Sequence, residues 1–549
     1  MRRLVITAAL LTVVGAAWAA PANPATATPN DPLYQSVRRL ALLAGQSPPS
    51  AVSPISYGEL EAVLRRMDVD RLAPEQQDQY RAALRRVVAG ASTVPGGTIA
   101  IESTLEGYFH SADDVDEWLY WYPDRRSLLS IPVRVSPVAG FGISMDLDWR
   151  QNYPIFPGYE GIYETITPDP LSNVFADLRE TDVQFPFHAL LTAAGSGWSM
   201  QFGRSRIGWG LGHTGSLLLS DHVEYHDFLM ASVFGRLISY RALYLDLEPW
   251  LNAGGTDPDR VYLAHRIEFR PSPWLTFAAN EALIFHGKAI ELRYLNPLMI
   301  LHNWFIPQYG NSMINLELSV RPLRGLEVWA HLAVDQVQSA LEKERSYTDS
   351  EPEAFGYLAG VEYAMPISDS WLTIGTEWAY LDPWMYIGRS IMGSLTYRRR
   401  VQAENVLPAG AKVIVEKSLG YPSGPDYYGV TGFAKLDLRT DFGTDLVLSL
   451  DMSFFANGEN EVGRSLPPDD ADDAARVTPS GPAPEFVTAA RLTADATFLE
   501  TELWGVPIEL SGGALLDVVR ILNNDHVSDA LLWDVQFSPY ISVSTIFGK

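Results

Sequence analysis

The chain of 549 residues contains no cysteine. Disulfides, thiolate metal sites and cysteine nucleophiles are therefore excluded. Basic residues are also scarce, with 41 Lys and Arg against 66 Asp and Glu, and the formal net charge is −25. A chain this acidic does not neutralise a phosphate backbone, so we expect no nucleic acid partner. Beyond the first twenty residues, no stretch reaches the run of about 18 apolar residues that a transmembrane helix needs.

The first twenty residues have the pattern of a secretory signal peptide. Two arginines open the chain, an apolar stretch follows to residue 14, and Ala-Trp-Ala at 17–19 forms a small-residue cleavage site. We therefore expect residues 1–19 to be removed on export. Residues 20–30 are rich in Ala, Pro and Thr and are predicted to form a flexible mature N-terminus.

Three short helices are predicted within residues 31–90. Asp31 stands before Pro32 as an N-cap ahead of the first apolar stripe. Ser56 and Glu59 form a capping box at the second stripe. Pro74 opens the third, whose apolar residues recur at helical spacing. Residues 31–90 are therefore predicted to form a small helical domain.

From residue 98 onward the apolar period changes to two, which is typical of half-buried strands. For example, Ile267 and Phe269 alternate with Arg266, Glu268 and Arg270. Segments of this kind recur to the C-terminus, about 16 to 20 in all by pattern. Short turns between them alternate with long polar or aromatic loops, near 111–127, 151–181, 286–311, 336–354, 400–427, 457–485 and 512–529.

This alternation is typical of a transmembrane β-barrel, with short turns at one end and long loops at the other. Its strands present apolar residues to lipid, and its closure leaves no unpaired edge. The 15 Trp and 25 Tyr then supply aromatic girdles at the two lipid interfaces. The sequence therefore predicts an all-β, antiparallel transmembrane barrel over residues 98–549, in contact with outer-membrane lipids and folded by the barrel-assembly machinery.

Residues 199–220 contain a formal match to a dinucleotide-binding fingerprint. Gly210, Gly212 and Gly215 have G-x-G-x-x-G spacing. Such a fingerprint must open a helix within a βαβ unit, because the pyrophosphate binds at the N-terminus of that helix. No capped helical stripe follows Gly215. We interpret the glycines as positions of sharp turning or close backbone packing, and we expect no cofactor.

The same run resembles a motif of the capsule-assembly Wzi family of outer-membrane proteins. From Trp209 the chain has the pattern W-G-x-G-x-x-G-x-L-x-L-S. Paired strands at 262–285 precede Leu-Asn-Pro-Leu, which contains Asn296 and Pro297, and residues 418–429 contain L-G-x-x-x-G-x-D. The resemblance spans most of residues 31–549. It implies an outer-membrane barrel of about 18 strands, closed on the periplasmic side by helices, that binds or orders exported polysaccharide without catalysis.

Two aromatic loops are candidates for contact with polysaccharide or lipopolysaccharide, because sugar recognition uses flat rings together with carboxylates and amides. The loop 110–127 combines rings with acidic residues and ends in two arginines, and the loop 286–312 holds further rings. An aromatic girdle with an acidic tip, and packing into the lumen, are the respective alternatives. The predicted contacts are Trp118, Tyr120, Trp121, Tyr122, Arg125, Arg126, Trp304 and Tyr309.

Other classes of function remain open. His222 and His226 would lie about 13 Å apart in a strand, too far for one ion, so we expect no metal. Ser216 near His213 raises a distant possibility of an outer-membrane hydrolase. The principal alternative is a diffusion porin, whose ion selectivity would depend on lumen-facing Arg266, Arg270, Glu268, Glu327 and Asp335.

Overall fold

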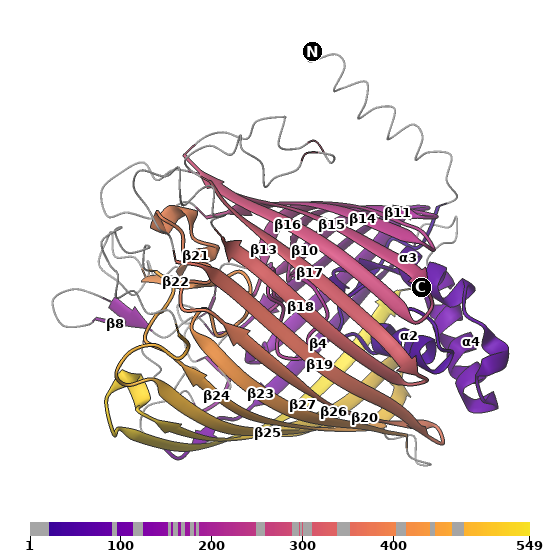
Figure 1. The fold of residues 1–549 in the computed structure, drawn as a ribbon. Helices are drawn as coiled ribbons and strands as arrows, with labels where there is room; N and C mark the ends of the chain where they lie inside the picture. The colour runs from indigo at the N-terminus through magenta and orange to yellow at the C-terminus, as the bar shows by residue number, and fades with distance from the viewer. Residues whose placement is uncertain are drawn as a thin grey trace.

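The fold consists of a closed barrel of strands with three α-helices at one end (Figure 1). The expected signal peptide lies outside the described residues. The computed structural model describes residues 21–89, 96–112, 124–151, 155–157, 163–165, 171–175, 181–182, 186–248, 259–287, 296, 299, 310–337, 352–401, 413–439, 445–463 and 477–548.

Within the described residues, an 18-stranded antiparallel barrel is closed by pairing of the last strand with the first, which confirms the predicted fold class. The short β5 (Phe109–His110) continues β4 along the last strand. The barrel strands are β4 (Gly96–Glu106), β6 (Leu129–Val138), β7 (Phe141–Trp149), β10 (His188–Gly195), β11 (Trp198–Ser205), β13 (His226–Phe234), β14 (Ile238–Leu247), β15 (Arg260–Ser272), β16 (Leu275–His286), β17 (Gly310–Leu323), β18 (Leu326–Gln336), β19 (Ala354–Ile367), β20 (Ser370–Leu381), β23 (Tyr427–Arg439), β24 (Asp445–Asn457), β25 (Glu485–Leu503), β26 (Val506–Leu522) and β27 (Leu531–Gly548).

Smaller elements lie between or before these strands. They are β1 (Thr26–Ala27), β2 (Val52–Ser53), β3 (Ile55–Ser56), β8 (Ile155–Pro157), β9 (Tyr163–Thr165), β12 (Gly208–Trp209), β21 (Thr396–Val401) and β22 (Val413–Ser418), with short 3₁₀ turns at η1 (Val69–Arg71), η5 (Ile391–Gly393) and η6 (Asn524–His526).

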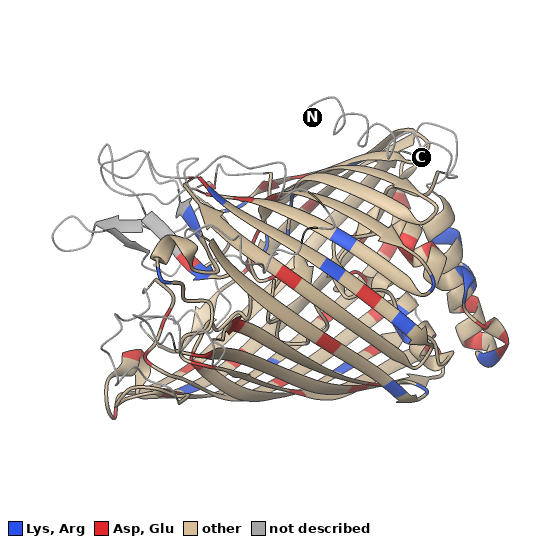
Figure 2. Ribbon diagram, turned by 45° about the horizontal axis from the view of Figure 1, so that its top comes forward, with Lys and Arg blue, Asp and Glu red and all other residues tan. Residues whose placement is uncertain are grey.

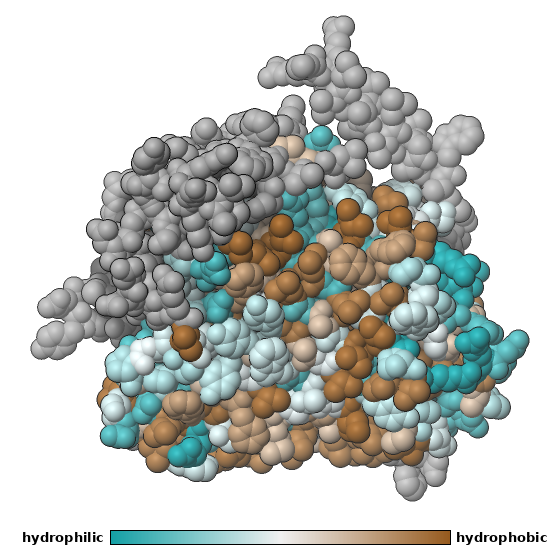
Figure 3. Space-filling model, in the orientation of Figure 1, coloured by the Kyte–Doolittle hydropathy of each residue, from teal (hydrophilic) through white to brown (hydrophobic). Residues whose placement is uncertain are grey.

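The barrel strands alternate between an outer apolar face and an inner polar face. On β15, Ile267 is 52% exposed and Phe269 is also exposed, whereas Arg266, Glu268 and Arg270 are buried. Figure 3 shows apolar side chains gathered over the outside of the strands. An exposed apolar outer face with a polar interior is the arrangement that a barrel adopts in lipid.

The connections differ between the two ends. Every hairpin turn at the end near the helices and the C-terminus is short, for example 196–197 and 273–274, and we call this the short-turn end (Figure 1). The long connections and β21–β22 lie at the opposite end, the long-loop end. One loop was misassigned, because β26 continues to Leu522. Gly512 and Gly513 are therefore strand residues, and they allow the neighbouring strands to approach closely. An added Cβ would lie 2.8 Å from Tyr540 O at Gly512 and 2.1 Å from Ala494 O at Gly513.

The helices are α2 (Pro32–Leu43), α3 (Tyr57–Arg65) and α4 (Pro74–Ala89). The Asp31 side chain accepts from Leu33 N and the Ser56 hydroxyl accepts from Glu59 N, as their N-cap patterns predict. The helices share one apolar core, and that core extends to Trp371 of the barrel wall. Among the described residues, no helix has both the length and the apolar content needed to cross a bilayer.

Residues 21–30 are packed rather than free, which corrects the expectation of a flexible terminus. Ala22 N donates to Ala194 O at 3.2 Å, and the Asn23 side chain donates to Val87 O at 2.9 Å. The segment also pairs β1 with β3. Its Ala and Pro content suggested mobility, but Pro24 packs against Gly142 of β7, where an added Cβ would lie 2.9 Å from Pro24 Cγ.

Candidate functional site

The glycine-rich run lies inside the barrel. Residues 206–225, all of them described, connect β11 to β13 and contain no helix, so the phosphate-binding interpretation is excluded on geometry. Trp209 is fully buried and pairs with Val52 through β12 and β2. The run therefore joins the N-terminal region to the barrel interior, and we call residues 206–225 the inner loop.

Three glycines of the run occupy positions that a side chain would disturb. Gly210 and Gly215 have φ of +119° and +148°, which L residues rarely adopt. A Cβ on Gly212 would lie 1.9 Å from Gly215 O, and one on Gly215 would lie 2.4 Å from Pro422 Cδ. The spacing thus makes a tight fold against a neighbouring loop.

A wall carboxylate fixes the tip of the inner loop. Glu377 on β20 accepts hydrogen bonds from His213 N at 2.9 Å and Thr214 N at 2.8 Å. It also accepts from the Thr214 hydroxyl at 2.5 Å and from Trp329 Nε1 at 2.9 Å. A buried carboxylate needs such partners, and here they hold the loop to the far side of the lumen.

Two later segments pack on the inner loop. The Tyr386 hydroxyl donates to Leu217 O at 2.8 Å and accepts from Tyr421 N at 2.9 Å. Burial raises the pKa of the Tyr421 phenol well above its usual value, so it stays a neutral hydrogen-bonding group. A Cβ on Gly420 would lie 2.5 Å from Leu217 O, so this glycine permits the contact.

The aspartate of the late L-G-x-x-x-G-x-D segment is a buried anchor. Asp426 is fully buried, and its carboxylate accepts from Ser480 N at 3.0 Å and Asn460 N at 3.3 Å. The Ser480 hydroxyl also donates to it. Asp426 therefore ties the long connection between β24 and β25 to the segment that packs on the inner loop.

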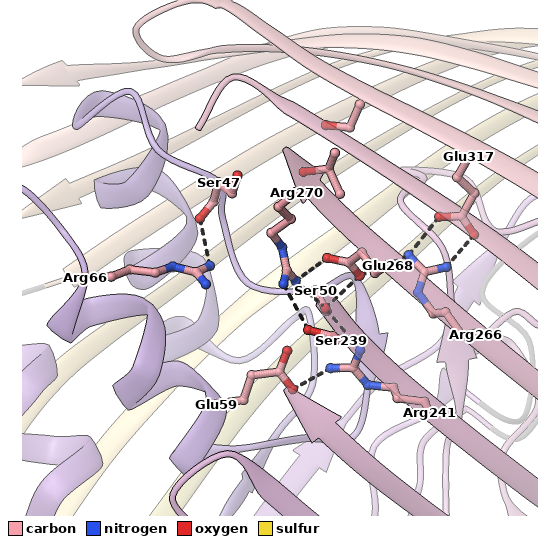
Figure 4. Close-up of polar contacts among 12 residues, drawn as sticks. Ser47, Ser50, Glu59, Arg66, Ser239, Arg241, Arg266, Glu268, Arg270 and Glu317 are labelled. Carbon is pink, nitrogen blue, oxygen red and sulfur yellow. Dashed lines mark hydrogen bonds and ion pairs between the residues drawn. The ribbon is translucent and has the colours of Figure 1, made fainter. Parts of the chain in front are cut away.

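The N-terminal region is held to the wall by buried ion pairs. Figure 2 shows charges of both signs on neighbouring strands, and Figure 4 shows how some of them meet at the helices. Glu59 of α3 pairs with Arg241, and Glu268 pairs with Arg270. Ser50 donates to Glu268 at 2.8 Å and accepts from Arg270 at 2.9 Å. Sequence analysis missed Ser50 and Glu59 as anchors, because their partners lie about two hundred residues away.

These contacts correct the porin-type assignment of five wall residues. Each is at most 6% exposed, and four take part in ion pairs. The fifth, Asp335, accepts from Tyr386 N at 2.6 Å. The five residues face inward, but their polar groups are buried and bonded to neighbouring groups instead of facing open water: Arg266, Glu268, Arg270, Glu327 and Asp335.

Some inward charged side chains elsewhere on the wall are more exposed to water than these five. We call β13–β20 the packed wall, and β23–β27 with β4–β7 the open wall. Arg491 donates to both oxygens of Asp517 at 2.8 Å, and the Arg491 side chain is 36% exposed. Arg134 pairs with Asp146 at 2.5 Å and is 42% exposed. Sequence analysis did not single out either pair. The signal that could have found them is a charged residue at an inward position on each of two neighbouring strands.

A cavity of about 340 Å³ lies between the inner loop and the open wall, and it is the candidate site. His213 contacts Asp451 at 2.5 Å and stacks on Phe433 with ring centroids 3.8 Å apart. Tyr421 and Tyr427 line the same cavity with centroids 4.9 Å apart. Rings, hydroxyls and ion pairs therefore share one water-accessible space.

Most of the predicted loop contacts fall outside the described residues: Trp118, Tyr120, Trp121, Tyr122, Trp304, Tyr309 and also Pro297 of the family motif. Asn296 is described and exposed. The Arg125 guanidinium lies 4.4 Å over the Tyr108 ring. That of Arg126 lies 3.6 Å over Tyr540 and contacts Asp495 at 3.4 Å.

The histidine and serine cluster has no hydrolase geometry. The buried Ser216 hydroxyl donates to Trp209 O, while the His213 ring contacts Asp451 instead of Ser216. Burial lowers the pKa of His222 to about 3, so this side chain is neutral. Within the described part of the chain, no group of three His, Asp or Glu residues has the geometry to hold a metal ion.

Comparison with solved structures finds the same architecture elsewhere. The Escherichia coli Wzi, described as a carbohydrate-binding β-barrel involved in group 1 capsule assembly, aligns over 94% of this chain and 98% of its own. Its TM-score is 0.54 at 13% identity, which shows a shared fold. Pseudomonas aeruginosa OccK3 aligns over 83% of this chain and 96% of its own, with a TM-score of 0.39 and 10% identity.

Sequence comparison finds one family model that matches part of the chain. No curated protein matches the chain. Residues 180–403, which contain β10, β11, the inner loop and the packed wall, match the family model of the capsule assembly protein Wzi. The resemblance predicted from the short motifs is thereby confirmed: over residues 180–403 the chain is similar to the Wzi family.

Proposed function

We propose that this protein is an outer-membrane barrel that binds, retains or organises surface polysaccharide and catalyses no reaction. The family match over residues 180–403 carries the proposal, because it falls on the inner loop and on the wall that holds it. The Escherichia coli Wzi is described as binding carbohydrate, and we extend that property to this chain.

The barrel surface supports the proposed location in the outer membrane. Its exposed apolar outer face suits outer-membrane lipid, and we propose that the barrel-assembly machinery inserts it. We propose that the long-loop end faces outward and the short-turn end, with its helices, faces the periplasm. Loops then present Trp118, Tyr120, Trp121, Tyr122, Trp304 and Tyr309 to polysaccharide or lipopolysaccharide, with Arg125 and Arg126 at the base.

The filled lumen argues against the porin alternative. The inner loop and the N-terminal region contact the packed wall through buried side chains, and a diffusion channel needs open space along its axis. The buried hydroxyl of Ser216 and the separate orientation of His213 argue against the hydrolase alternative.

The first test measures where the polysaccharide goes. Cell-bound and released polysaccharide are quantified in a deletion strain and in the same strain complemented with the wild-type chain. We expect synthesis to continue while material shifts from the cells to the medium, and to return on complementation. If that shift is seen, Trp118→Ala and Trp121→Ala are the next substitutions, which test the loops. An unchanged distribution, together with reduced uptake of small solutes and steady conductance in planar bilayers, would replace this proposal with the porin.

A further inference from the structure

The cavity at the open wall has the size of a small-ligand site. Its volume of about 340 Å³ falls within the range of about 300–1,000 Å³ for such sites. Strands β23, β24, β25 and β26 form one side, and residues of the inner loop and of the 419–426 segment form the other. Its lining residues therefore come from elements far apart in the chain, and the described lining includes no residue of the loops 110–127 and 286–312.

Small side chains create this space. Inward positions next to the cavity hold Ser453 and Ala489, whereas equivalent inward positions of the packed wall hold Tyr262 and Trp329. Large inward side chains there pack against the inner loop, as the Tyr262 hydroxyl does on Leu218 O at 3.4 Å. The open wall has small side chains at the positions beside the cavity, so the cavity exists because of the residues that the sequence places there.

The lining combines a ring surface with polar groups. The half-buried Phe455 ring lies 5.5 Å from the Tyr427 ring, which braces it. Around it stand Asp451, the Arg491–Asp517 pair and the hydroxyls of Thr431 and Ser453, which bond each other at 2.9 Å. A ring face for C–H groups beside carboxylates and hydroxyls is what a pyranose needs.

The charge of the lining selects among sugars. The two carboxylates of the lining already have basic partners: Asp451 contacts His213 at 2.5 Å, and Asp517 accepts two of the five N–H groups of Arg491. A uronate or other anionic sugar would bring a further negative charge beside these two carboxylates, whereas a neutral sugar can use the remaining N–H groups of Arg491. Resting on the proposed function, we propose that the cavity binds a neutral sugar residue of the polysaccharide, stacked on Phe455.

The test uses the full barrel purified in detergent, with calorimetric titration. The probes are oligosaccharides released by partial acid hydrolysis of the producing strain's own surface polysaccharide, separated by anion exchange into neutral and acidic fractions. Ala489→Phe fills the cavity without changing its charge. Its matched control is Ala494→Phe, on the lipid-facing side of the same strand. Arg491→Gln is a second variant that does not fill the cavity but removes the guanidinium from its lining, in case Ala489→Phe fails to fold.

We expect the neutral fraction to bind wild type and Ala494→Phe equally. Ala489→Phe should weaken binding at least tenfold, and Arg491→Gln about tenfold, the effect of losing one hydrogen bond to a charged group. Unchanged affinity in both cavity variants would overturn the cavity site while leaving the proposed function intact. Preference for the acidic fraction would overturn the neutral-sugar assignment. If wild type binds neither fraction and deletion leaves the polysaccharide in place, the proposed function itself fails.

Discussion

The strands of the packed wall and of the open wall share the same alternation of apolar outward and charged inward residues, but the inward charges play different parts. On the packed wall, the Arg266 side chain is 3% exposed between two glutamates, and inserted segments cover it. On the open wall, Arg134 is 42% exposed opposite a single aspartate. An inward charge in the sequence therefore does not by itself mark a pore or a ligand site. The segment that faces the charge across the lumen decides whether the charge forms a buried ion pair or stays exposed to water.

The largest effect is expected from breaking a buried ion pair of the packed wall. Arg266→Ala leaves the carboxylates of Glu268 and Glu317 buried without this partner, so the free energy of unfolding should fall by about 3–5 kcal/mol. Denaturant unfolding in detergent, followed by the heat-dependent gel shift of folded barrels, measures the change. A loss below 1 kcal/mol would mean that the packed wall is as wet as the open one.

A close second is expected at the inner loop. Gly212→Ala places a Cβ 1.9 Å from Gly215 O, so the loop must shift, at a cost of about 3 kcal/mol, near the upper end for overpacking. Because the loop fills the lumen, we also expect conductance in planar bilayers to rise above that of wild type. Gly432→Ala is the control, since a Cβ there has no atom within 4 Å. Equal conductance in both variants would show that the loop does not seal the lumen.

A smaller effect is expected where Asp426 ties the β24–β25 connection inward. Asp426→Asn keeps the shape but removes the charge that accepts from Ser480 and Asn460, and should cost about 1–2 kcal/mol. Limited proteolysis of the purified barrel should then cut faster within residues 458–483 than in wild type. No change in cleavage would mean that this connection is held by other contacts.

The smallest effect is expected on the open wall. Arg134→Gln removes an exposed pair with Asp146, so the free energy of unfolding should change by less than about 1 kcal/mol. The same denaturant unfolding serves as the measurement, with Arg266→Ala beside it. A loss similar to that of Arg266→Ala would erase the distinction between the two walls.

The strands of the barrel wall could be predicted from the sequence, whereas the contacts inside the lumen could not. Period-two alternation predicts the strands, and the caps at Asp31 and Ser56 predict two of the helix starts, because both depend on neighbours in the chain. The anchors Ser50, Glu59 and Glu377 were missed, because each pairs with residues more than 160 positions away. The glycine run was noticed for its spacing, yet its role depends on Pro422 and Gly420, which only the closed barrel brings near.

The placement of the inner loop has a consequence for the order of assembly. Residues 206–225 enter between β11 and β13, yet Glu377, Tyr386 and Asp451 lie on or after β20. Earlier contacts, of Trp209 with Val52 and of Leu218 O with the Tyr262 hydroxyl, involve only the N-terminal region and β15. The base of the loop therefore depends on elements that precede β20, whereas its tip depends on elements of the second half of the wall.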